Sequence, residues 1–222
     1  MKKVLLRSSG MDSYIMAKLW QPDIELYFRC GSVYQEAEMK RLPRHVIIDD
    51  MFTLGKWEIP SNLIIPLRNA YFLLGAANYG DHILLGATAG DRVLDKSVEF
   101  AAKMQDLLNY LWQPDHWTIG REFNVDVTFK QFTKTELVEM FIEADGDLDA
   151  LNNETYSCYS GFDEACGECK PCFRKWVALK KFGLDIHPKT KDYIVRTIVP
   201  QIEAGTYNRA EEEREIMEAI NV

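Results

Sequence analysis

The sequence predicts an α/β protein with a doubly wound, mostly parallel β-sheet, and three features of its pattern indicate this class. Short apolar runs suited to buried strands alternate with stretches in which apolar residues recur at helical spacing. Small, turn-forming residues such as Gly31 and Gly86 follow these runs, and no repeat or low-complexity linker interrupts the alternation. Ligands of such sheets bind beyond the carboxyl ends of the strands. We therefore expect the functional site at that edge.

The first strand and the first helix flank the stretch LLRSSGMDS at residues 5–13. Residues 4–6 form an apolar run of the kind that fills a buried parallel strand, and helical spacing begins at Ser13. The turn between them exposes backbone N–H groups at a helix N-terminus, where a phosphate or pyrophosphate binds well. Many α/β proteins have such a turn and bind nothing there, so the turn alone leaves both interpretations open.

The rest of the chain continues the alternation. We expect further strands within residues 24–28, 45–50, 81–86 and 123–127. Helices are expected after Gly31, from Pro66 to Ala77 with Gly80 closing the helix, over residues 97–112, from Thr133 or Thr135, and within residues 156–182. The helix over residues 97–112 has an apolar face made of Phe100, Met104, Leu107, Leu108 and Leu111. The charged tail, residues 188–222, is expected to be helical, with residues 210–220 packing one apolar face on the body.

Length, composition and net charge predict a cytoplasmic protein whose substrates are small molecules. The 222 residues, 47% apolar and 27% charged, suit one sizeable domain, or one domain with a small appendage. No apolar stretch approaches the ~20 residues that span a membrane, and Arg7 and Asp12 follow the first apolar run too soon for a signal peptide. The net charge of −8 argues against a protein whose main partner is nucleic acid, because such proteins present a basic face.

Four of the five cysteines fall within fifteen residues, and their spacing is C-x7-C-x2-C-x2-C. These four are Cys158, Cys166, Cys169 and Cys172. Such spacing lets the thiolates converge on one ion, and a closed tetrahedral set of four thiolates is typical of structural zinc. An iron–sulfur cluster is the alternative, because four thiolates also hold one. With no open coordination position, the metal is expected to support the fold and not the chemistry.

Five motifs, in order, resemble one known family. SSGMDS is similar to the S-G-G-x-D-S pyrophosphate loop of the N-type ATP pyrophosphatases, with Ser9 replacing the first glycine. Four further segments resemble those of the 7-cyano-7-deazaguanine (preQ0) synthases, namely GSVYQEAE, PLRNAYFLLGAANYG, FTKTELVEMF and ETYSCYSGFDEACGECKPC. The likeness extends to about Phe182 and implies an adenine nucleotide alpha hydrolase-like fold. It also implies a PP-loop ATP pyrophosphatase domain over residues 1–150 and a zinc-binding, helical C-terminal segment over residues 151–222.

The resemblance implies an ATP-dependent carbon–nitrogen ligase of queuosine biosynthesis. Such an enzyme adenylates 7-carboxy-7-deazaguanine, condenses it with ammonia to an amide or nitrile, and releases AMP and pyrophosphate. ATP and Mg²⁺ are then expected beside zinc, and a homodimer is expected from the family. The residues implied in catalysis are Asp12, Ser13, Lys134 and Arg68. The residues implied in nucleotide binding are Ser8, Ser9, Gly10, Met11, Asp12, Ser13, Arg68, Asn69 and Asp91.

Each of these side chains also has a plainer interpretation. Arg68 and Asn69 also suit N-terminal capping and a surface salt bridge, and Lys134 also suits a solvated lysine at a helix start. Arg174, just beyond the last cysteine, is expected on the surface of its helix.

The motifs that would bind the deazaguanine acid match the family pattern less well than the motifs that would bind ATP. In the synthases, the loop after the central strand carries an E-T-D-x-S-G-Y-P-D-like run that recognises the deazaguanine. Here the loop reads GATAGDRVLDKS, where Asp91 stays in register but Ala89 and Gly90 replace the Glu–Thr pair. Two alternatives therefore stay open. One is a PP-loop enzyme that thiolates tRNA, and the other is a zinc-stabilised nucleotide-binding module without turnover.

Overall fold

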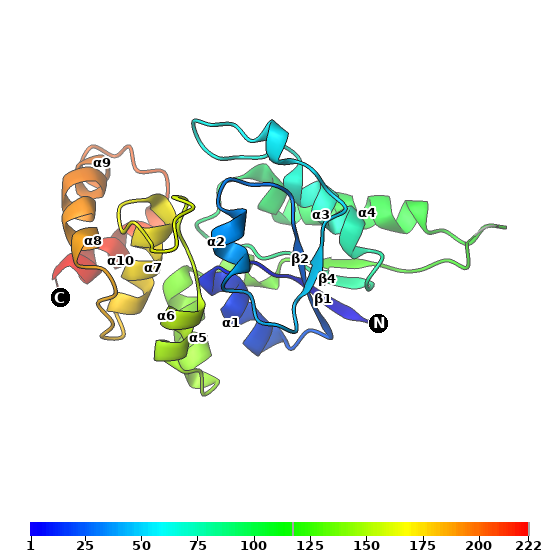
Figure 1. Ribbon diagram of the computed structural model, residues 1–222, viewed down its shortest axis with the longest axis horizontal. Coiled ribbons are helices and arrows are strands. Elements are labelled where there is room, and N and C mark those ends of the chain that lie inside the picture. Colours follow the sequence, from blue (N-terminus) through cyan, green and yellow to red (C-terminus); the bar gives the residue numbers. More distant parts are fainter. Residues whose placement is uncertain (117, 222) are drawn as a thin grey trace.

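The computed structural model describes residues 1–116 and 118–221, and these form a parallel sheet with helices on both faces (Figure 1). The strands are β1 (Lys3–Leu6), β2 (Ile24–Phe28), β3 (Ile47–Asp49), β4 (His82–Leu84) and β5 (Asn124–Asp126). Their spatial order is β3-β2-β1-β4-β5, and every neighbouring pair is parallel. The order reverses beside β1, which is the switch point where ligands of doubly wound sheets bind. The predicted fold class is confirmed.

Ten α-helices lie among the described residues, with shorter helical turns between them. They are α1 (Met11–Trp20), α2 (Gln35–Met39), α3 (Arg68–Ala76), α4 (Val98–Leu111), α5 (Lys134–Glu143), α6 (Leu148–Glu154), α7 (Lys170–Lys180), α8 (Pro188–Tyr193), α9 (Val199–Glu203) and α10 (Ala210–Asn221). The turns are η1 (Gly55–Trp57), η2 (Leu94–Lys96), η3 (Thr128–Gln131) and η4 (Ile194–Ile198). Helices α7 to α10 gather at one end of the molecule, beyond α5 and α6 (Figure 1).

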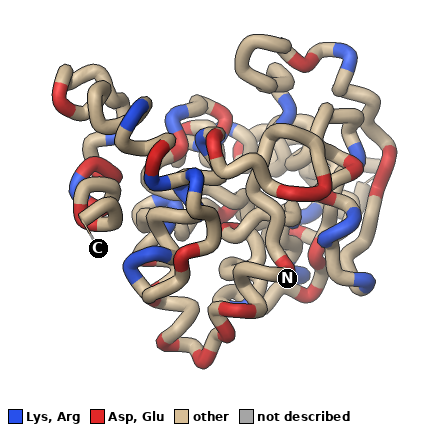
Figure 2. Tube along the Cα trace, turned by 60° about the vertical axis from the view of Figure 1, so that its left-hand side comes forward, with Lys and Arg blue, Asp and Glu red and all other residues tan. Residues whose placement is uncertain are grey.

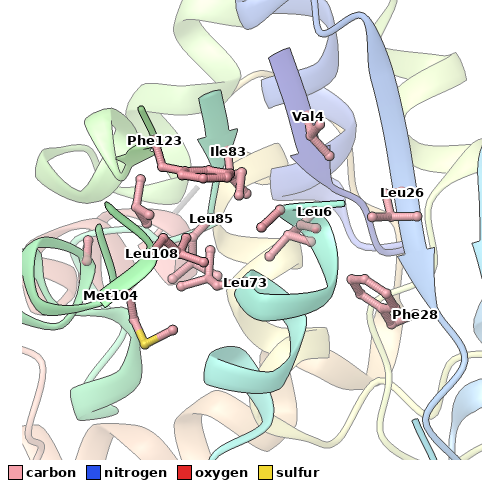
Figure 3. Close-up of a cluster of buried hydrophobic side chains, with 14 residues drawn as sticks. Val4, Leu6, Leu26, Phe28, Leu73, Ile83, Leu85, Met104, Leu108 and Phe123 are labelled. Carbon is pink, nitrogen blue, oxygen red and sulfur yellow. The ribbon is translucent and has the colours of Figure 1, made fainter. Parts of the chain in front are cut away.

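The central strands β1 and β4 are buried on both faces, which explains their continuous apolar runs, whereas the edge strand β3 exposes Ile47 and Ile48. Val4 and Leu6 point toward α3 and α4, where they join Leu73 and Leu108 (Figure 3). Leu5 points to the opposite face and packs with residues of α1 and α5. Because successive side chains of a strand alternate between faces, this short run contributes to the hydrophobic core on both faces of the sheet. It thereby fixes the start of the loop that follows β1.

Three predicted elements differ in detail from the structure. Leu107 and Leu111 of α4 are 41% and 47% exposed, because the helix buries a narrower stripe through Ala101, Met104 and Leu108. Helix α3 begins at Arg68 and ends at Ala76, so neither Pro66 nor Gly80 bounds it. A Cβ at Gly80 would lie 2.5 Å from the Lys2 carbonyl oxygen, so close backbone approach requires this glycine. Val127 lies just beyond β5.

The C-terminal helix docks as predicted. Ile216 and Ala219 of α10 are buried in one cluster with Phe173 and Trp176 of α7. No helix among the described residues combines the length and apolarity needed to cross a bilayer. The division near residue 150 and the homodimer stay predictions.

Leu67, immediately before α3, adopts a left-handed backbone conformation with φ of 61° and is exposed. A side chain with a β-carbon is strained there, and glycine is not. We expect Leu67→Gly to raise the free energy of unfolding by about 1 kcal/mol, after allowing for the extra chain entropy of glycine. In thermal unfolding this corresponds to a Tm gain of about 2–4 °C. Leu67→Ala keeps the β-carbon and should give no gain; an equal gain from both variants would contradict backbone strain as the cause.

Candidate active site

A cavity of about 470 Å³ opens beyond the carboxyl ends of β1, β2 and β4. Its walls come from the loop after β1, from α2, from the first residues of α3 and α5, and from the cysteine-rich segment before α7. This volume is in the range of sites for cofactors and other small molecules. The cavity lies at the edge where the sequence predicts the site, and its role as the functional site stays a prediction.

The loop after β1 is organised by hydroxyl groups and one buried arginine. Ser13 Oγ accepts a hydrogen bond from the Ser8 amide at 3.1 Å and from Arg7 Nη1 at 2.7 Å. The Gly10 amide donates to Ser8 Oγ at 3.2 Å, and Gly10 precedes α1 without a side-chain cap. Arg7 is anchored in turn by Glu25, whose Oε2 lies 2.9 Å from Arg7 Nε. The loop is thus held open toward the cavity by contacts of its own residues.

Lys134 and Asp12 meet at the cavity from two helices. A capping box fixes the start of α5: Thr133 Oγ1 accepts from the Glu136 amide at 3.2 Å, and Glu136 Oε2 accepts from the Thr133 amide at 2.7 Å. Lys134, the first residue of α5, then forms an ion pair with Asp12 in the first turn of α1. Burial lowers the pKa of the Lys134 ammonium, and Asp12 acts in the opposite direction. Lys134 is therefore a partly buried, paired group and not a solvated helix-end lysine.

Asp12 has one oxygen with no protein partner. Its Oδ2 pairs with Lys134, whereas its Oδ1 is buried and has no hydrogen-bond partner among the described residues. A buried carboxylate oxygen left unpaired is costly. Carboxylate oxygens are the ligands that Mg²⁺ prefers, so this atom fits a magnesium ion at the cavity.

Asp91 is the acidic centre of a second charged cluster. Its Oδ2 accepts from the Thr88 amide at 3.0 Å and from Lys96 Nζ at 3.2 Å. Burial alone would raise the pKa of Asp91, but the charges of Lys96, Lys134 and Arg174 hold it well below the usual range. Asp91 is therefore ionised at neutral pH, and it stabilises the positive charges around it.

Arg174 lies inside the site, contrary to the expectation of a surface position. Its side chain is 11% exposed, and it pairs with Glu212 of α10, with 2.8 Å between Nε and Oε1. Tyr207 Oη donates to the other carboxylate oxygen of Glu212 at 3.0 Å. The sequence does not predict this pair, because α10 is distant from Arg174 in the chain. Glu212 is one of several glutamates in the tail, and nothing in the local pattern indicates that it is buried.

The Arg174–Glu212 pair requires glycine at position 90. A Cβ on Gly90 would lie 1.9 Å from Glu212 Oε1 and 2.2 Å from Arg174 Nη2. We expect Gly90→Ala to separate this ion pair and to lower the free energy of unfolding by about 1–3 kcal/mol. Denaturant unfolding measures the change. Gly86→Ala is the matched control, because its Cβ would meet only Met16 Sδ at 3.7 Å; equal stability of both variants would refute the clash.

Arg68 and Asn69 do not serve as surface or capping residues. Arg68 Nη1 donates to Tyr34 Oη at 2.9 Å inside the cavity, and Asn69 Nδ2 donates to the Asp95 carbonyl at 3.2 Å. Burial alone would lower the pKa of Arg68, but Tyr34, Cys30 and Glu38 raise it above its usual value. Arg68 therefore stays charged where a ligand would bind.

Ser9 occupies a different place from the other loop residues. It is buried, and its side chain does not line the cavity: Ser9 Oγ donates to the Tyr156 carbonyl at 3.2 Å. The Tyr156 amide donates to the Ser9 carbonyl at 2.8 Å. These two bonds tie the loop to the segment that carries the cysteines. Ser9 therefore connects two segments of the fold and does not contact the cavity through its side chain.

The four predicted cysteines converge. Their Sγ atoms all lie within 4.8 Å of one another, with 3.6 Å between Cys158 and Cys166 and 3.9 Å between Cys158 and Cys169. Four sulfurs at about 2.3 Å from a tetrahedral zinc are about 3.8 Å apart, so the cluster matches this geometry. Backbone amides of Ser160 and Cys166 point at Cys158 Sγ from 3.3 and 3.4 Å, as expected for a thiolate. The residues fit a structural metal such as zinc.

The parallel sheet, the small-residue loop at the start of α1 and the four-cysteine cluster define the class: an α/β protein with a loop suited to phosphate at the switch point of its sheet and a cluster that could hold a metal ion. The family model "Queuosine biosynthesis protein QueC" matches residues 32–183. The chain belongs to this family, and the prediction of an enzyme of this family is confirmed.

Curated relatives match over most of the chain. A 7-cyano-7-deazaguanine synthase of Acidobacterium capsulatum is 32% identical over 81% of this chain and 92% of its own length. The synthases of Nitratiruptor sp. and Thermoplasma volcanium are 24% and 27% identical, over 82% and 77% of this chain and 96% and 83% of their own lengths.

Proposed function

We propose that the protein is an ATP-dependent ligase that adenylates 7-carboxy-7-deazaguanine, or a closely related acid, and condenses it with ammonia. The observation that carries the proposal is the convergence of the loop at residues 8–13 with the Lys134–Asp12 pair in one cavity. The names of the family and of the relatives, which are queuosine biosynthesis protein and 7-cyano-7-deazaguanine synthase, support the choice of acid.

The loop would bind the β- and γ-phosphates of ATP. The Ser8 and Gly10 amides now donate to nearby hydroxyls at 3.1–3.2 Å, and phosphate oxygens are stronger acceptors that can replace these hydroxyls. The N-terminus of α1 adds the positive end of its dipole. Lys134 would contact the phosphates, and Asp12 Oδ1 would hold Mg²⁺. When bound, the ion supplies charge neutralisation between phosphate oxygens.

A free carboxylate is a poor electrophile, so adenylation must precede bond formation with nitrogen. One carboxylate oxygen attacks the α-phosphorus, the bond to the bridging oxygen breaks, and pyrophosphate leaves with the electron pair. The loop amides and Lys134 stabilise that departing charge. Ammonia then attacks the acyl carbon, loses a proton, and AMP leaves to give the amide. A second adenylation on the amide oxygen, followed by loss of AMP and protons, gives the nitrile.

The cationic side chains around the cavity suit two anionic substrates. Arg68 lies in the same cavity as the loop, and Arg174 and Lys96 surround Asp91. An overall charge of −8 with this local set of cations favours small anions over a polynucleotide. In the view of Figure 2, basic and acidic positions are interspersed along the trace.

Incubation with ATP, Mg²⁺, ammonia and 7-carboxy-7-deazaguanine, followed by mass spectrometry, tests the proposal. We expect AMP, pyrophosphate, the amide and then the nitrile. Pyrophosphate release with other acids but not with this one would mean a different acceptor. Sulfur transfer to tRNA would favour the thiolation alternative, and tight ATP binding without turnover would favour a binding module.

A further inference from the structure

Glu38 is a carboxylate that the proposed adenylation does not use. It lies on α2 and lines the cavity beside the loop after β1. Its Oε2 accepts a hydrogen bond from Tyr27 Oη at 3.1 Å. Unlike Asp12 and Asp91, which pair with Lys134 and Lys96, it forms no salt bridge within 4 Å among the described residues. A carboxylate in this setting has acceptor capacity left for a ligand that donates hydrogen bonds.

An aromatic surface lies one helical turn from Glu38. Tyr34 precedes α2, and the Glu38 amide donates to the Tyr34 carbonyl at 3.1 Å, so both side chains lie on the same side of this short helix. The ring of Tyr34 stacks on that of Tyr159, with 5.3 Å between the ring centroids and an interplanar angle of 27°. Tyr159 also lines the cavity and keeps 44% of its surface exposed. Its exposed part can therefore contact a ligand in the cavity.

We propose that Glu38 recognises the N1–H and 2-amino edge of the 7-deazaguanine ring, with Tyr159, supported from behind by Tyr34, stacking against the heterocycle. This inference rests on the proposed function, because it names the residues that would bind the deazaguanine acid in the same cavity. The ring nitrogen N1–H and the 2-amino group of a guanine-like base are two neighbouring donors. A carboxylate is acceptor-only and matches such a pair. Adenine lacks this donor pair, so Glu38 would bind the deazaguanine acid in preference to the adenine ring of ATP.

The carboxylates that line the cavity are few. The loop after β4 contributes none at positions 89 and 90, which are Ala89 and Gly90. Among the described residues, four carboxylates line the cavity: Asp12, Glu38, Asp91 and Asp95. The first and third have cationic partners, which leaves Glu38 and Asp95 as candidates. Glu38 is favoured because the aromatic pair adjoins it.

The charges around Glu38 make recognition pH-dependent. Tyr27 faces it from β2, Arg68 from α3 and Arg7 from the end of β1, and Cys30 and Tyr34 lie close by. Burial raises the pKa of Glu38 to about 7, against the opposing effects of Tyr27 and Arg68. The ionised form accepts both donors, so affinity for the acid should rise as the pH increases through about 7. Glu38→Gln should remove this dependence.

The test compares 7-carboxy-7-deazaguanine with its analogue that lacks the 2-amino group. For each acid, the measurements are equilibrium binding without ATP, and the kcat and KM of AMP formation. We expect the wild type to prefer the amino compound by roughly 100-fold, since a hydrogen bond to a charged group contributes about 1.5–3 kcal/mol. In Glu38→Gln the preference should fall below about 5-fold, through KM for the acid, with KM for ATP unchanged.

Two variants serve as controls. Glu36→Gln changes an exposed carboxylate on the same helix and should keep the full preference. Asp95→Asn should keep it as well, and loss of preference in this variant alone would overturn the proposal. A rise in KM for ATP in Glu38→Gln would also overturn it, because Glu38 would then contact the nucleotide. If the wild type binds the acid selectively and Glu38→Gln does not, yet no AMP forms, the proposed function fails and this assignment stands.

Discussion

Replacing Lys134 with methionine is expected to lower kcat/KM for AMP formation by about 100- to 1,000-fold. That is the usual effect of removing one donor from a site that stabilises developing negative charge. The Lys134 ammonium is paired with Asp12 at the cavity, and burial lowers its pKa, so its charge acts in a poorly hydrated place. The measurement is the initial rate of pyrophosphate release at varied ATP concentration. Lys103→Met changes an exposed lysine and should leave kcat/KM unchanged.

Loss of stability must be separated from loss of chemistry. Lys134→Met leaves Asp12 with neither oxygen paired, and because the Asp12 side chain is 25% exposed we expect a cost of about 1–3 kcal/mol. The double variant Asp12→Asn with Lys134→Met removes the charge of Asp12 and should recover most of the stability. Because Asp12 would itself hold Mg²⁺, the double variant reports on stability and not on chemistry. Near-normal turnover in Lys134→Met, measured below its unfolding temperature, would mean that Lys134 only supports the fold.

Replacing Cys169 with serine is expected to abolish stoichiometric metal and to lower Tm by more than 10 °C. Structural zinc contributes about 10–16 kcal/mol to the folding of small zinc-dependent units, and the four cysteine sulfurs lie within 4.8 Å of one another, as its ligands would. ATP binding should weaken too, because the Tyr156–Ser9 bonds tie this segment to the loop after β1. Elemental analysis and thermal unfolding measure the two effects.

The matched control is Cys30→Ser. Cys30 is buried, but it lies outside the four-cysteine cluster, so the variant should retain one metal per chain. Elemental analysis also separates zinc from iron, and an iron–sulfur cluster would add visible absorption. Full metal content in Cys169→Ser would contradict a tetrathiolate site.

Local signals in the sequence predicted the parts of the site that are local in the chain. The loop at residues 8–13 and the four cysteines are each contained in one short segment, so spacing and residue type suffice to recognise them. Thr133 was one of two predicted caps, and the capping box selects it. The alternation of strands and helices predicts a doubly wound, mostly parallel sheet, but it does not fix the strand order, which the structure supplies.

The parts that the sequence did not predict depend on contacts between distant segments. Arg174, whose side chain is 11% exposed, pairs with Glu212 of α10, and the periodicity of α10 indicates its apolar face alone. The exposure of Leu107 and Leu111 depends on how far the sheet extends beneath α4, which no local pattern encodes. Glu38 resembles other surface glutamates until α2 is folded against β2 and α3.

Isotope transfer from the acid to AMP tests the central claim most directly. With 7-carboxy-7-deazaguanine labelled by ¹⁸O in both carboxylate oxygens, adenylation predicts that each AMP released carries one ¹⁸O atom, seen by mass spectrometry as a shift of two mass units. The first AMP takes its label from the acid and the second from the amide, while pyrophosphate stays unlabelled. Unlabelled AMP, or ADP together with labelled phosphate, would contradict the account.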